Sequence, residues 1–399
     1  MNKSIRNFQS DIYPYIKEKL SEFRKNGVVL WGKGSSALAF LQFLRDFDAA
    51  DAVKGFCDSY TKEGSHELIA NKKVYSPYEA QLKYPNATFV IASIFSHNIV
   101  DYIKKDSRLR NIKIFSFSKD KNKAEYVAFI YSCLYLRYVL GQHDSCVCNY
   151  LKFFDYFEDL RESNRYESLK KLAISMLHDD LSKKIISNKM DFFSYGNLDY
   201  LNSIPIEFSG GPYFNFYESH LSSEEVFFDC GAFTGDSVGN FIHAVKNKYK
   251  KILAFEPDEK NYKKLVETAN RNKWNNIKCI KAATGNKHIY TCFSETGSLG
   301  AKLSDISEKS KQVLQVCLDE YIDDCPTLIK MDIEGAELAC LMGAEQIIKK
   351  LKPKIAICLY HKPQDLFEIP IYLKQLVPEY RLIVKQHYHP LFDTVLYAM

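Results

Sequence analysis

The chain has 399 residues, which is enough for two or three average domains. Its hydrophobic fraction of 46% and charged fraction of 26% fit a globular protein and exclude a disordered chain. The net charge of +5 is small for this length, so nothing in the composition calls for a nucleic-acid partner.

Eleven cysteines are scattered along the chain without the paired spacing of a zinc site. Their odd number and scatter favour a reducing compartment over a disulfide framework. The first twenty residues lack the apolar core of a signal peptide. No uncharged apolar stretch reaches the roughly 18–20 residues that a membrane-spanning helix needs. We therefore expect a cytoplasmic protein with no transmembrane segment.

The first third of the chain alternates between strand and helix patterns. Leading helices in residues 1–26 precede apolar strands that are separated by amphipathic helices. This alternation implies parallel pairing and predicts a small Rossmann-like α/β domain over residues 1–118. The expected strands are 28–31, 52–58, 72–77, 87–93 and 111–117, and the expected helices are 36–47 and 97–105.

Residues 119–203 show mainly helical spacing and are interpreted as a helical connector, and residues 204–399 as the last domain. In that domain the final two of seven strands follow each other without a long helix. A parallel sheet closed by such a hairpin is the seven-stranded sheet of S-adenosylmethionine-dependent methyltransferases. The strands are expected at 225–231, 250–257, 276–283, 325–332, 352–360, 380–388 and 393–399, and the helices at 235–247, 259–272, 335–350 and 364–377.

The turn after the first of these strands, VFFDCGAFTGDS at 226–237, has the spacing of a ligand-binding turn. Gly231 and Gly235 carry no side chain, so the backbone there can approach a ligand closely. Asp229 would repel a pyrophosphate but can accept hydrogen bonds from an amino group, which favours S-adenosylmethionine over NAD. A turn with glycines for packing alone is the alternative.

Glu256 ends the next strand, where an acid can accept hydrogen bonds from both hydroxyls of a ribose. Pro257 ends that strand. The third strand ends in the small residue Ala282, which leaves room beside an adenine. The segment TGSLGAKLS at 296–304 is interpreted either as a loop over the site or as a solvated hairpin.

The fourth strand ends in Asp332, and Glu334 follows before a helix. Such an acid pair can orient an acceptor hydroxyl, take its proton or hold a divalent cation, and capping of the helix is the alternative. His361 follows the fifth strand at the same rim and can act as general base. His387 and His389 are weaker candidates for substrate contacts.

The motifs VFFDCGAFTGDS, AFEPDEKN, IKMDIEGAE, KPKIAICLYHKPQDL and DTVLYAM stand in order over 226–399 and together resemble the FkbM family of S-adenosylmethionine-dependent methyltransferases. The resemblance implies a Rossmann-like methyltransferase fold and methyl transfer, usually to a hydroxyl of a sugar or polyketide. The catalytic candidates are His361, Asp332 and Glu334, and the cofactor-binding candidates are Asp229, Gly231, Ala232, Gly235, Glu256, Pro257 and Ala282.

The turn at 32–37 in the first domain also has small residues, and Asp58 ends the second strand as a ribose acid would. Lys33 follows the first glycine, however, and the domain is short for a full dinucleotide site. The domain resembles the nucleotide-binding domains that precede such methyltransferases. We interpret it as a structural or oligomerising module, with binding of a nucleotide sugar as the alternative.

The sequence thus predicts an O-methyltransferase that acts on a saccharide or nucleotide-sugar hydroxyl in capsule or surface polysaccharide biosynthesis. Its cofactor would be S-adenosyl-L-methionine, and the need for a divalent cation is left open, as is a homo-oligomer. One alternative is a nucleotide-sugar-binding scaffold with an inactive methyltransferase half. Another is an oxidoreductase that uses the N-terminal turn, although no convincing hydride-transfer site follows residue 58 in the sequence.

Overall fold

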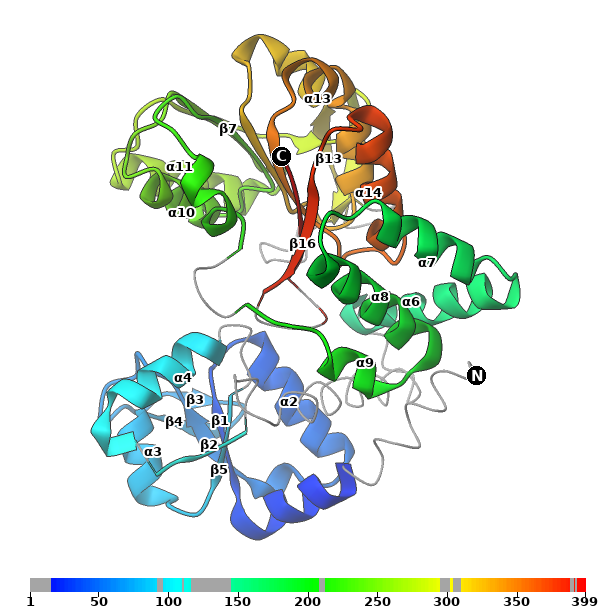
Figure 1. Cartoon of the computed structure of the whole chain (residues 1–399). Coiled ribbons are helices and arrows are strands. Elements are labelled where there is room, and N and C mark those ends of the chain that lie inside the picture. The colour runs from blue at the N-terminus through cyan, green and yellow to red at the C-terminus, as the bar shows by residue number, and fades with distance from the viewer. Residues whose placement is uncertain are drawn as a thin grey trace. The chain divides into compact units, whose positions relative to one another are not determined.

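The computed structural model describes residues 16–91, 96–109, 111–115, 145–207, 212–294, 302–303, 310–387, 391 and 393–399. Most of the 296–304 segment and His389 therefore lie outside the described residues. The chain divides into an N-terminal unit, Met1–Asp159 with Asp191–Ser203, and a C-terminal unit, Leu160–Met190 with Ile204–Met399. Figure 1 labels the elements of both units.

The N-terminal unit is built on a six-stranded sheet with the order β3-β4-β2-β1-β5-β6. All neighbours are parallel except β3 and β4, and α2 covers one face while α3 and α4 cover the other (Figure 1). This confirms a Rossmann-like α/β fold. The elements are a helix at 16–26, β1 Val28–Trp31, α2 Ser35–Asp46, η1 Ala50–Ala52, β2 Val53–Cys57, β3 Leu68–Ile69, β4 Lys72–Tyr75, α3 Pro77–Lys83, β5 Thr88–Ile91, α4 Ser96–Lys105, η2 Ser107–Leu109 and β6 Lys113–Phe115.

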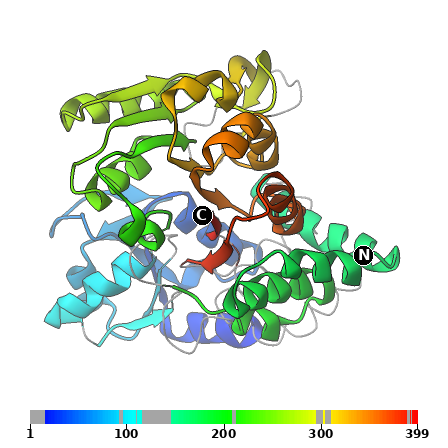
Figure 2. The same cartoon turned by 45° about the horizontal axis from the view of Figure 1, so that its top comes forward.

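The described part of the predicted connector is helical, as expected. It comprises α6 Ser145–Glu162, α7 Tyr166–Ser175, α8 Asp180–Tyr195 and α9 Leu198–Asn202. Within the C-terminal unit, α7 packs against α14, which Figure 2 shows from a second direction.

The C-terminal unit contains a seven-stranded sheet with the order β16-β17-β15-β14-β7-β8-β9. The strands β15, β14, β7, β8 and β9 run parallel, and β17 pairs antiparallel with both β15 and β16. This confirms the predicted sheet and its closing hairpin. The strands are β7 Val226–Cys230, β8 Lys251–Phe255, β9 Ile277–Ile280, β14 Leu328–Met331, β15 Lys354–Cys358, β16 Leu382–Gln386 and β17 Thr394–Ala398.

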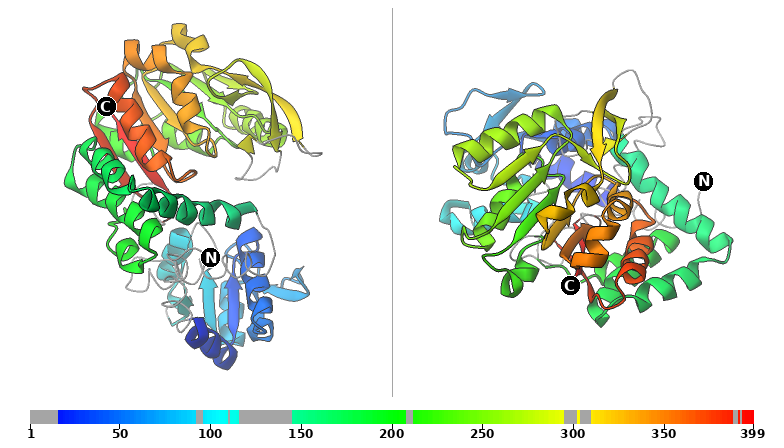
Figure 3. Two further views of the ribbon diagram at one scale, coloured as in Figure 1. Left: turned by 90° about the vertical axis from the view of Figure 1, so that its right-hand side faces the viewer. Right: turned by 90° about the horizontal axis from the view of Figure 1, so that it is seen from above.

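Helices cover both faces of this sheet, with α10 and α11 on one face and α13 and α14 on the other (Figures 1 and 3). The strands are buried on both faces because apolar side chains of the helices pack onto them, as Phe241 of α10 and Leu265 of α11 do. The helices are η3 Asn215–His220, α10 Asp236–Ala244, α11 Glu259–Arg271, η4 Leu318–Asp324, α12 Glu337–Met342, α13 Glu345–Leu351 and α14 Asp365–Leu376.

The single helix predicted over 335–350 is wrong, because the structure has two helices there, α12 and α13. A Cβ at Gly343 would collide with the carbonyl oxygen of Gly285, so the chain passes very close to a neighbouring segment at the break. The carboxylate of Asp319 accepts hydrogen bonds from the N–H groups of Gln346 and Ile347 in the first turn of α13. This cap starts a new helix where the sequence pattern continues.

A second sheet, with the order β10-β13-β11-β12, was not predicted. It lies in the chain between β9 and β14 and contains β10 Ala283–Thr284, β11 Ile289–Ser294, β12 Lys302–Leu303 and β13 Ser310–Val316. Polar residues interrupt these strands, and β10 and β12 are only two residues long, so their sequences give little periodic signal.

The glycine turn allows a direct test of the packing that positions it. Gly231 has φ +79°, and a Cβ there would collide with the carbonyl oxygen of Asp332. We expect Gly231→Ala to lower the free energy of unfolding by about 2–4 kcal/mol, from backbone strain and overpacking together. Gly239→Ala, in α10 of the same unit, meets only Trp274 at ordinary contact distance and should change stability by at most about 1 kcal/mol. Urea denaturation measures both, and equal effects would contradict this explanation.

Candidate active site

The glycine turn after β7 is hydrogen-bonded to the end of β8. The N–H groups of Gly231 and Ala232 both donate to the carbonyl oxygen of Phe255, at 3.0 Å. Gly231, Phe233 and Gly235 have φ of +79°, +48° and +93°. Positive φ is unfavourable for a residue such as Phe233, and strain of this kind concentrates at functional sites.

Asp229 lies beneath this turn with its side chain buried. Its carboxylate accepts a hydrogen bond from Ser237 Oγ, and its Oδ1 lies 3.1 Å from Nζ of Lys330 on β14. Lys330 Nζ also donates to the carbonyl oxygen of Gly231, at 2.7 Å. Asp229 therefore holds the turn through Lys330, while its contact with an amino group of the cofactor stays a prediction.

Lys330 is a site residue that the sequence interpretation missed. Burial lowers the pKa of Lys330, but nearby carboxylates, that of Asp229 first, outweigh burial and hold the pKa above its ordinary value. The side chain is therefore a buried cation. The sequence did contain a signal for this residue, a lysine inside the apolar run LIKM. Because an unpaired charge does not persist in a buried strand, such a lysine indicates an acidic partner.

Glu256 lies at the end of β8, as predicted, and is almost fully buried. Its Oε2 accepts a hydrogen bond from Phe233 N at 2.9 Å, and its Oε1 accepts one from Asp258 N at 2.8 Å. Burial raises the pKa of Glu256 to about 7, although these two N–H donors act in the opposite direction. The carboxyl group thus titrates in the neutral range and stands directly beside the glycine turn.

Pro257 follows Glu256 after β8. Ala282 follows the carboxyl end of β9, the strand next to β8 in the sheet. Ala282 is buried, as is Ala232 in the glycine turn. The structure thus brings all the predicted cofactor-binding residues to the ends of β7, β8 and β9. Which of them contact a cofactor stays a prediction.

Asp332 lies at the end of β14 and is surrounded by hydroxyl groups. Tyr213 donates to its Oδ2 at 2.8 Å, and Tyr360 donates to its Oδ1 at 3.3 Å. Burial raises the pKa of Asp332, but the charges of Lys330 and His361 outweigh it, so that the pKa lies below its usual range. Asp332 is therefore a carboxylate at neutral pH.

Tyr213 was missed as a partner of Asp332 because it precedes β7 by more than ten residues. Its φ of +80° is strained for a bulky residue, and its backbone N–H donates to Tyr397 Oη at 3.0 Å. The chain thus enters the C-terminal sheet in a conformation that aims this phenol at Asp332.

His361 is brought next to the acid pair, as the sequence predicted. Its Nε2 lies 3.5 Å from Asp332 Oδ1 and 3.8 Å from Glu334 Oε2. Its Nδ1 lies 2.8 Å from Oε1 of Glu337, the first residue of α12, which the sequence interpretation did not select. The spacing IEGAE did show two acids three residues apart at a helix start, and the second of them proves to be fully buried.

The electrostatics around His361 favour a positive charge. Burial lowers the pKa of His361, but the carboxylates of Glu337 and Asp332 outweigh burial and raise the pKa to about 10. The imidazole is then protonated at neutral pH in the ligand-free protein. Its role as general base requires loss of this proton and stays a prediction.

Other candidates lie apart from this cluster or belong to the N-terminal unit. His387 Nε2 lies 2.8 Å from Tyr397 Oη, and burial lowers the pKa of His387 to about 4, so that it is neutral. In the N-terminal unit, Lys33 pairs with Glu67 at 3.0 Å, and Asp58 Oδ1 accepts from Tyr60 N. Ligand binding there stays a prediction.

Comparison with known proteins identifies the C-terminal domain. The sheet order is that of a Rossmann-like methyltransferase fold. Residues 229–387, less than half of the chain, match the model of the methyltransferase FkbM domain. Residues 229–387 therefore form a methyltransferase FkbM domain, and the family resemblance seen in this part of the sequence is confirmed.

The chain is also similar to several solved structures. Methyltransferase FkbM from Methylobacillus flagellatus KT is 21% identical and has a TM-score of 0.55, with 99% of each chain covered. An rRNA methylase from Streptococcus thermophilus is 16% identical over 46% of this chain and 90% of its own, with a TM-score of 0.32. Fibrillarin from Aeropyrum pernix, in complex with S-adenosyl-L-methionine, is 12% identical over 45% of this chain and 69% of its own, with a TM-score of 0.28. Of these, only the structure from Methylobacillus flagellatus KT supports the fold described above.

None of the curated proteins compared with the chain matches it. Among the described residues, no helix has the length and apolar character to cross a bilayer.

The buried pair of Lys330 and Asp229 leads to a prediction about stability. Lys330→Met should lower the free energy of unfolding by about 3–5 kcal/mol, because it leaves Asp229 buried without its cation. Lys349→Met removes an exposed lysine that pairs with Glu345 and should cost at most about 1 kcal/mol. Thermal and urea unfolding distinguish the two variants. Equal stabilities would show that Asp229 does not depend on Lys330.

Proposed function

We propose that the chain is an S-adenosylmethionine-dependent O-methyltransferase that acts on a saccharide hydroxyl, in the assembly of a capsule or other surface polysaccharide. The observation that carries the proposal is the position of Glu256. An ionised carboxylate has about four lone-pair sites, and backbone N–H groups occupy one on each oxygen of Glu256. Each oxygen can still accept one hydrogen bond from a ribose hydroxyl.

The turn between Gly231 and Gly235 lies beside this acid and would receive the methionine part of the cofactor. The sulfonium carries a positive charge, which suits a rim lined by Asp332 and Glu334. The methyl group moves by direct displacement, so alignment of acceptor and cofactor is the main contribution of the protein.

The acceptor side of the proposal rests on Asp332 and its aromatic neighbours. Its carboxylate can orient an acceptor hydroxyl, and the rings of Tyr213 and Tyr360 beside it suit contact with the face of a sugar. The acceptor is a saccharide or nucleotide sugar in this proposal. Support for it comes from the sequence resemblance and from this lining.

A nucleotide-sugar-binding scaffold with an inactive methyltransferase half is the alternative. Under that alternative, the residues at the ends of β7 and β8 would not bind S-adenosylmethionine. Calorimetry with S-adenosylmethionine, and separately with NAD, distinguishes the enzyme, the scaffold and an oxidoreductase. The cytoplasmic location and any homo-oligomer stay predictions.

The pKa of Glu256 leads to a prediction about cofactor affinity. Because ribose hydroxyls donate to the ionised carboxylate, affinity for S-adenosylmethionine should rise with pH and level off above about 7. Well below that pH it should fall by up to about tenfold per pH unit. Glu256→Gln should bind more weakly and lose this pH dependence. A wild-type affinity that does not change between pH 6 and 8 would contradict the role of Glu256.

The reaction itself can be tested in cells. Deletion of the gene should remove one O-methyl group from a surface glycan, as detected by mass spectrometry. The wild-type gene and His288→Ala, which changes an exposed histidine paired with Glu320, should restore it. Asp332→Asn should not, because turnover should fall by about 10²-fold or more while the protein still binds S-adenosylmethionine. Glycans that are identical with and without the gene would rule out this acceptor class.

A further inference from the structure

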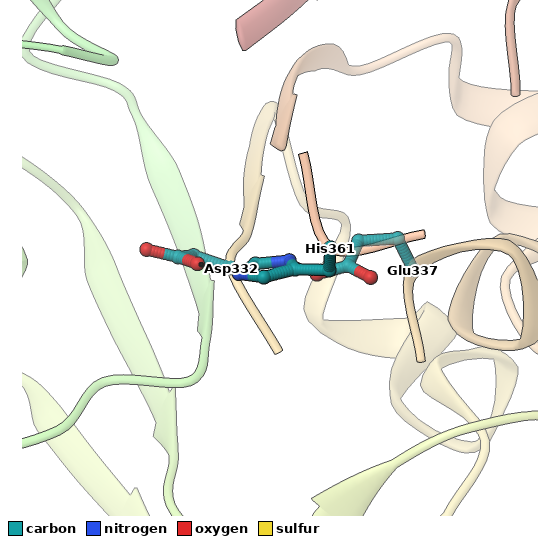
Figure 4. Close-up of side chains that lie close together, drawn as sticks. All are labelled: Asp332, Glu337 and His361. Carbon is teal, nitrogen blue, oxygen red and sulfur yellow. Dashed lines mark hydrogen bonds and ion pairs between the residues drawn. The ribbon is translucent and has the colours of Figure 1, made fainter. Parts of the chain in front are cut away.

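One imidazole lies among several carboxylates at the carboxyl ends of β14 and β15. Figure 4 shows the ring of His361 between the side chains of Asp332 and Glu337. Each of the three residues offers a ligand atom, and these atoms lie within 4.8 Å of one another. They come from the turn after β14, the start of α12 and the turn after β15, so the fold assembles them.

The two ring nitrogens of His361 have different surroundings. Nδ1 lies 2.8 Å from Glu337 Oε1, which is a good hydrogen bond. Nε2 is buried and makes no hydrogen bond within the part of the chain that the structure describes. The side chain is only 8% exposed, so solvent does not readily supply a partner. A buried polar atom without a hydrogen bond needs an explanation, and a bound ion would provide one.

The carboxylates near Nε2 lie at distances that suit ligands of one ion. Asp332 Oδ1 is 3.5 Å away and Glu334 Oε2 is 3.8 Å away, both too far for a good hydrogen bond. Ligand atoms at right angles around an ion, each about 2.1–2.5 Å from it, are about 3.0–3.5 Å apart. Small rotations of Asp332 and the partly exposed Glu334 would bring all three atoms onto one ion.

We propose that His361 Nε2, Asp332 and Glu334 bind a divalent cation, which displaces the proton of Nε2 to solvent, with Glu337 as the residue that orients the imidazole. A histidine that ligates a metal usually donates its other N–H to a carboxylate, as Nδ1 does to Glu337 here. Glu337 is itself fixed, because it is fully buried and accepts a second hydrogen bond from Ile333 N at 2.9 Å.

The ligand set indicates the class of ion. One imidazole with two carboxylates suits Mn²⁺ and similar divalent first-row ions better than Ca²⁺, which prefers oxygen ligands alone. The cation would lie on the rim to which we assign the acceptor, so its use in orienting an acceptor oxygen rests on the proposed function. The binding site itself does not.

Mn²⁺ alone is a suitable probe, because its binding is measured without cofactor or acceptor. After treatment of the full chain with a chelator, calorimetry should detect one Mn²⁺ per chain. Pulsed electron paramagnetic resonance should show coupling of the ion to an imidazole nitrogen. Both His361→Gln and Asp332→Asn should weaken binding at least tenfold, and His361→Gln should abolish the nitrogen coupling. Glu337→Gln should weaken binding about 10–100-fold through loss of orientation.

His288→Ala is the matched control, since it removes an exposed histidine beside an acid elsewhere and should leave Mn²⁺ binding unchanged. Thermal unfolding of each variant shows whether it is folded, and the nitrogen coupling in the wild type needs no variant at all. Absence of saturable binding, or binding without nitrogen coupling, would overturn the cation site. Binding of S-adenosylmethionine in the presence of chelator tests the proposed function separately, so either proposal can fail alone.

Discussion

The buried ion pair between Lys330 and Asp229 is the interaction on which the cofactor side of the site depends. It joins β14 to β7, two neighbouring strands whose ends carry the glycine turn and Asp332. Two charges removed from water cost several kcal/mol each unless they are paired and hydrogen-bonded. Here Ser237 and the carbonyl oxygen of Gly231 supply the remaining hydrogen bonds. The pair therefore stabilises one geometry of the turn more than it stabilises the fold as a whole.

Three non-glycine residues of the site have a strained backbone. Tyr213, Phe233 and Glu334 all have positive φ, although none is a glycine. Each contributes a specific contact at the rim: a phenol to Asp332, an N–H to Glu256, and a carboxylate near His361. Positive φ in such residues costs of order 1–3 kcal/mol each and persists only where the surroundings enforce it. The strain is consistent with a rim shaped for binding, because none of these contacts is needed to build the sheet.

Much of the fold could be predicted from sequence, for a simple physical reason. Strands buried on both faces are continuous apolar runs, and every strand of the seven-stranded sheet was predicted within a few residues. Glu256 and Asp332 could be located for the same reason, since a charged residue that ends such an apolar run is expected where the strand leaves the buried sheet, at its carboxyl end. The second sheet and the break between α12 and α13 could not, because they depend on short strands and on a close approach between segments distant in the chain.

The site residues that were missed share one property: their roles come from tertiary contacts. Lys330 acquires its role from its pairing with Asp229 on the neighbouring strand, and Tyr213 acquires its role from the hydrogen bond that its hydroxyl donates to Asp332. Glu337 acquires its role from its hydrogen bond with His361. In each case the residue type was visible, but the partner lies 24 to more than 100 positions away, where local spacing carries no information.

The two sides of the site also differ in how their charges are balanced, and this difference separates their functions. On the side of β7 and β8, the charge of Asp229 is met by Lys330, and Glu256 is held by two backbone N–H groups. On the side of β14 and β15, three carboxylates surround a single imidazole. The charges on the first side are balanced by groups of the protein, whereas the second side retains an excess of negative charge. A sulfonium cofactor and a divalent cation, both proposed above, are ligands that such an excess of negative charge would attract.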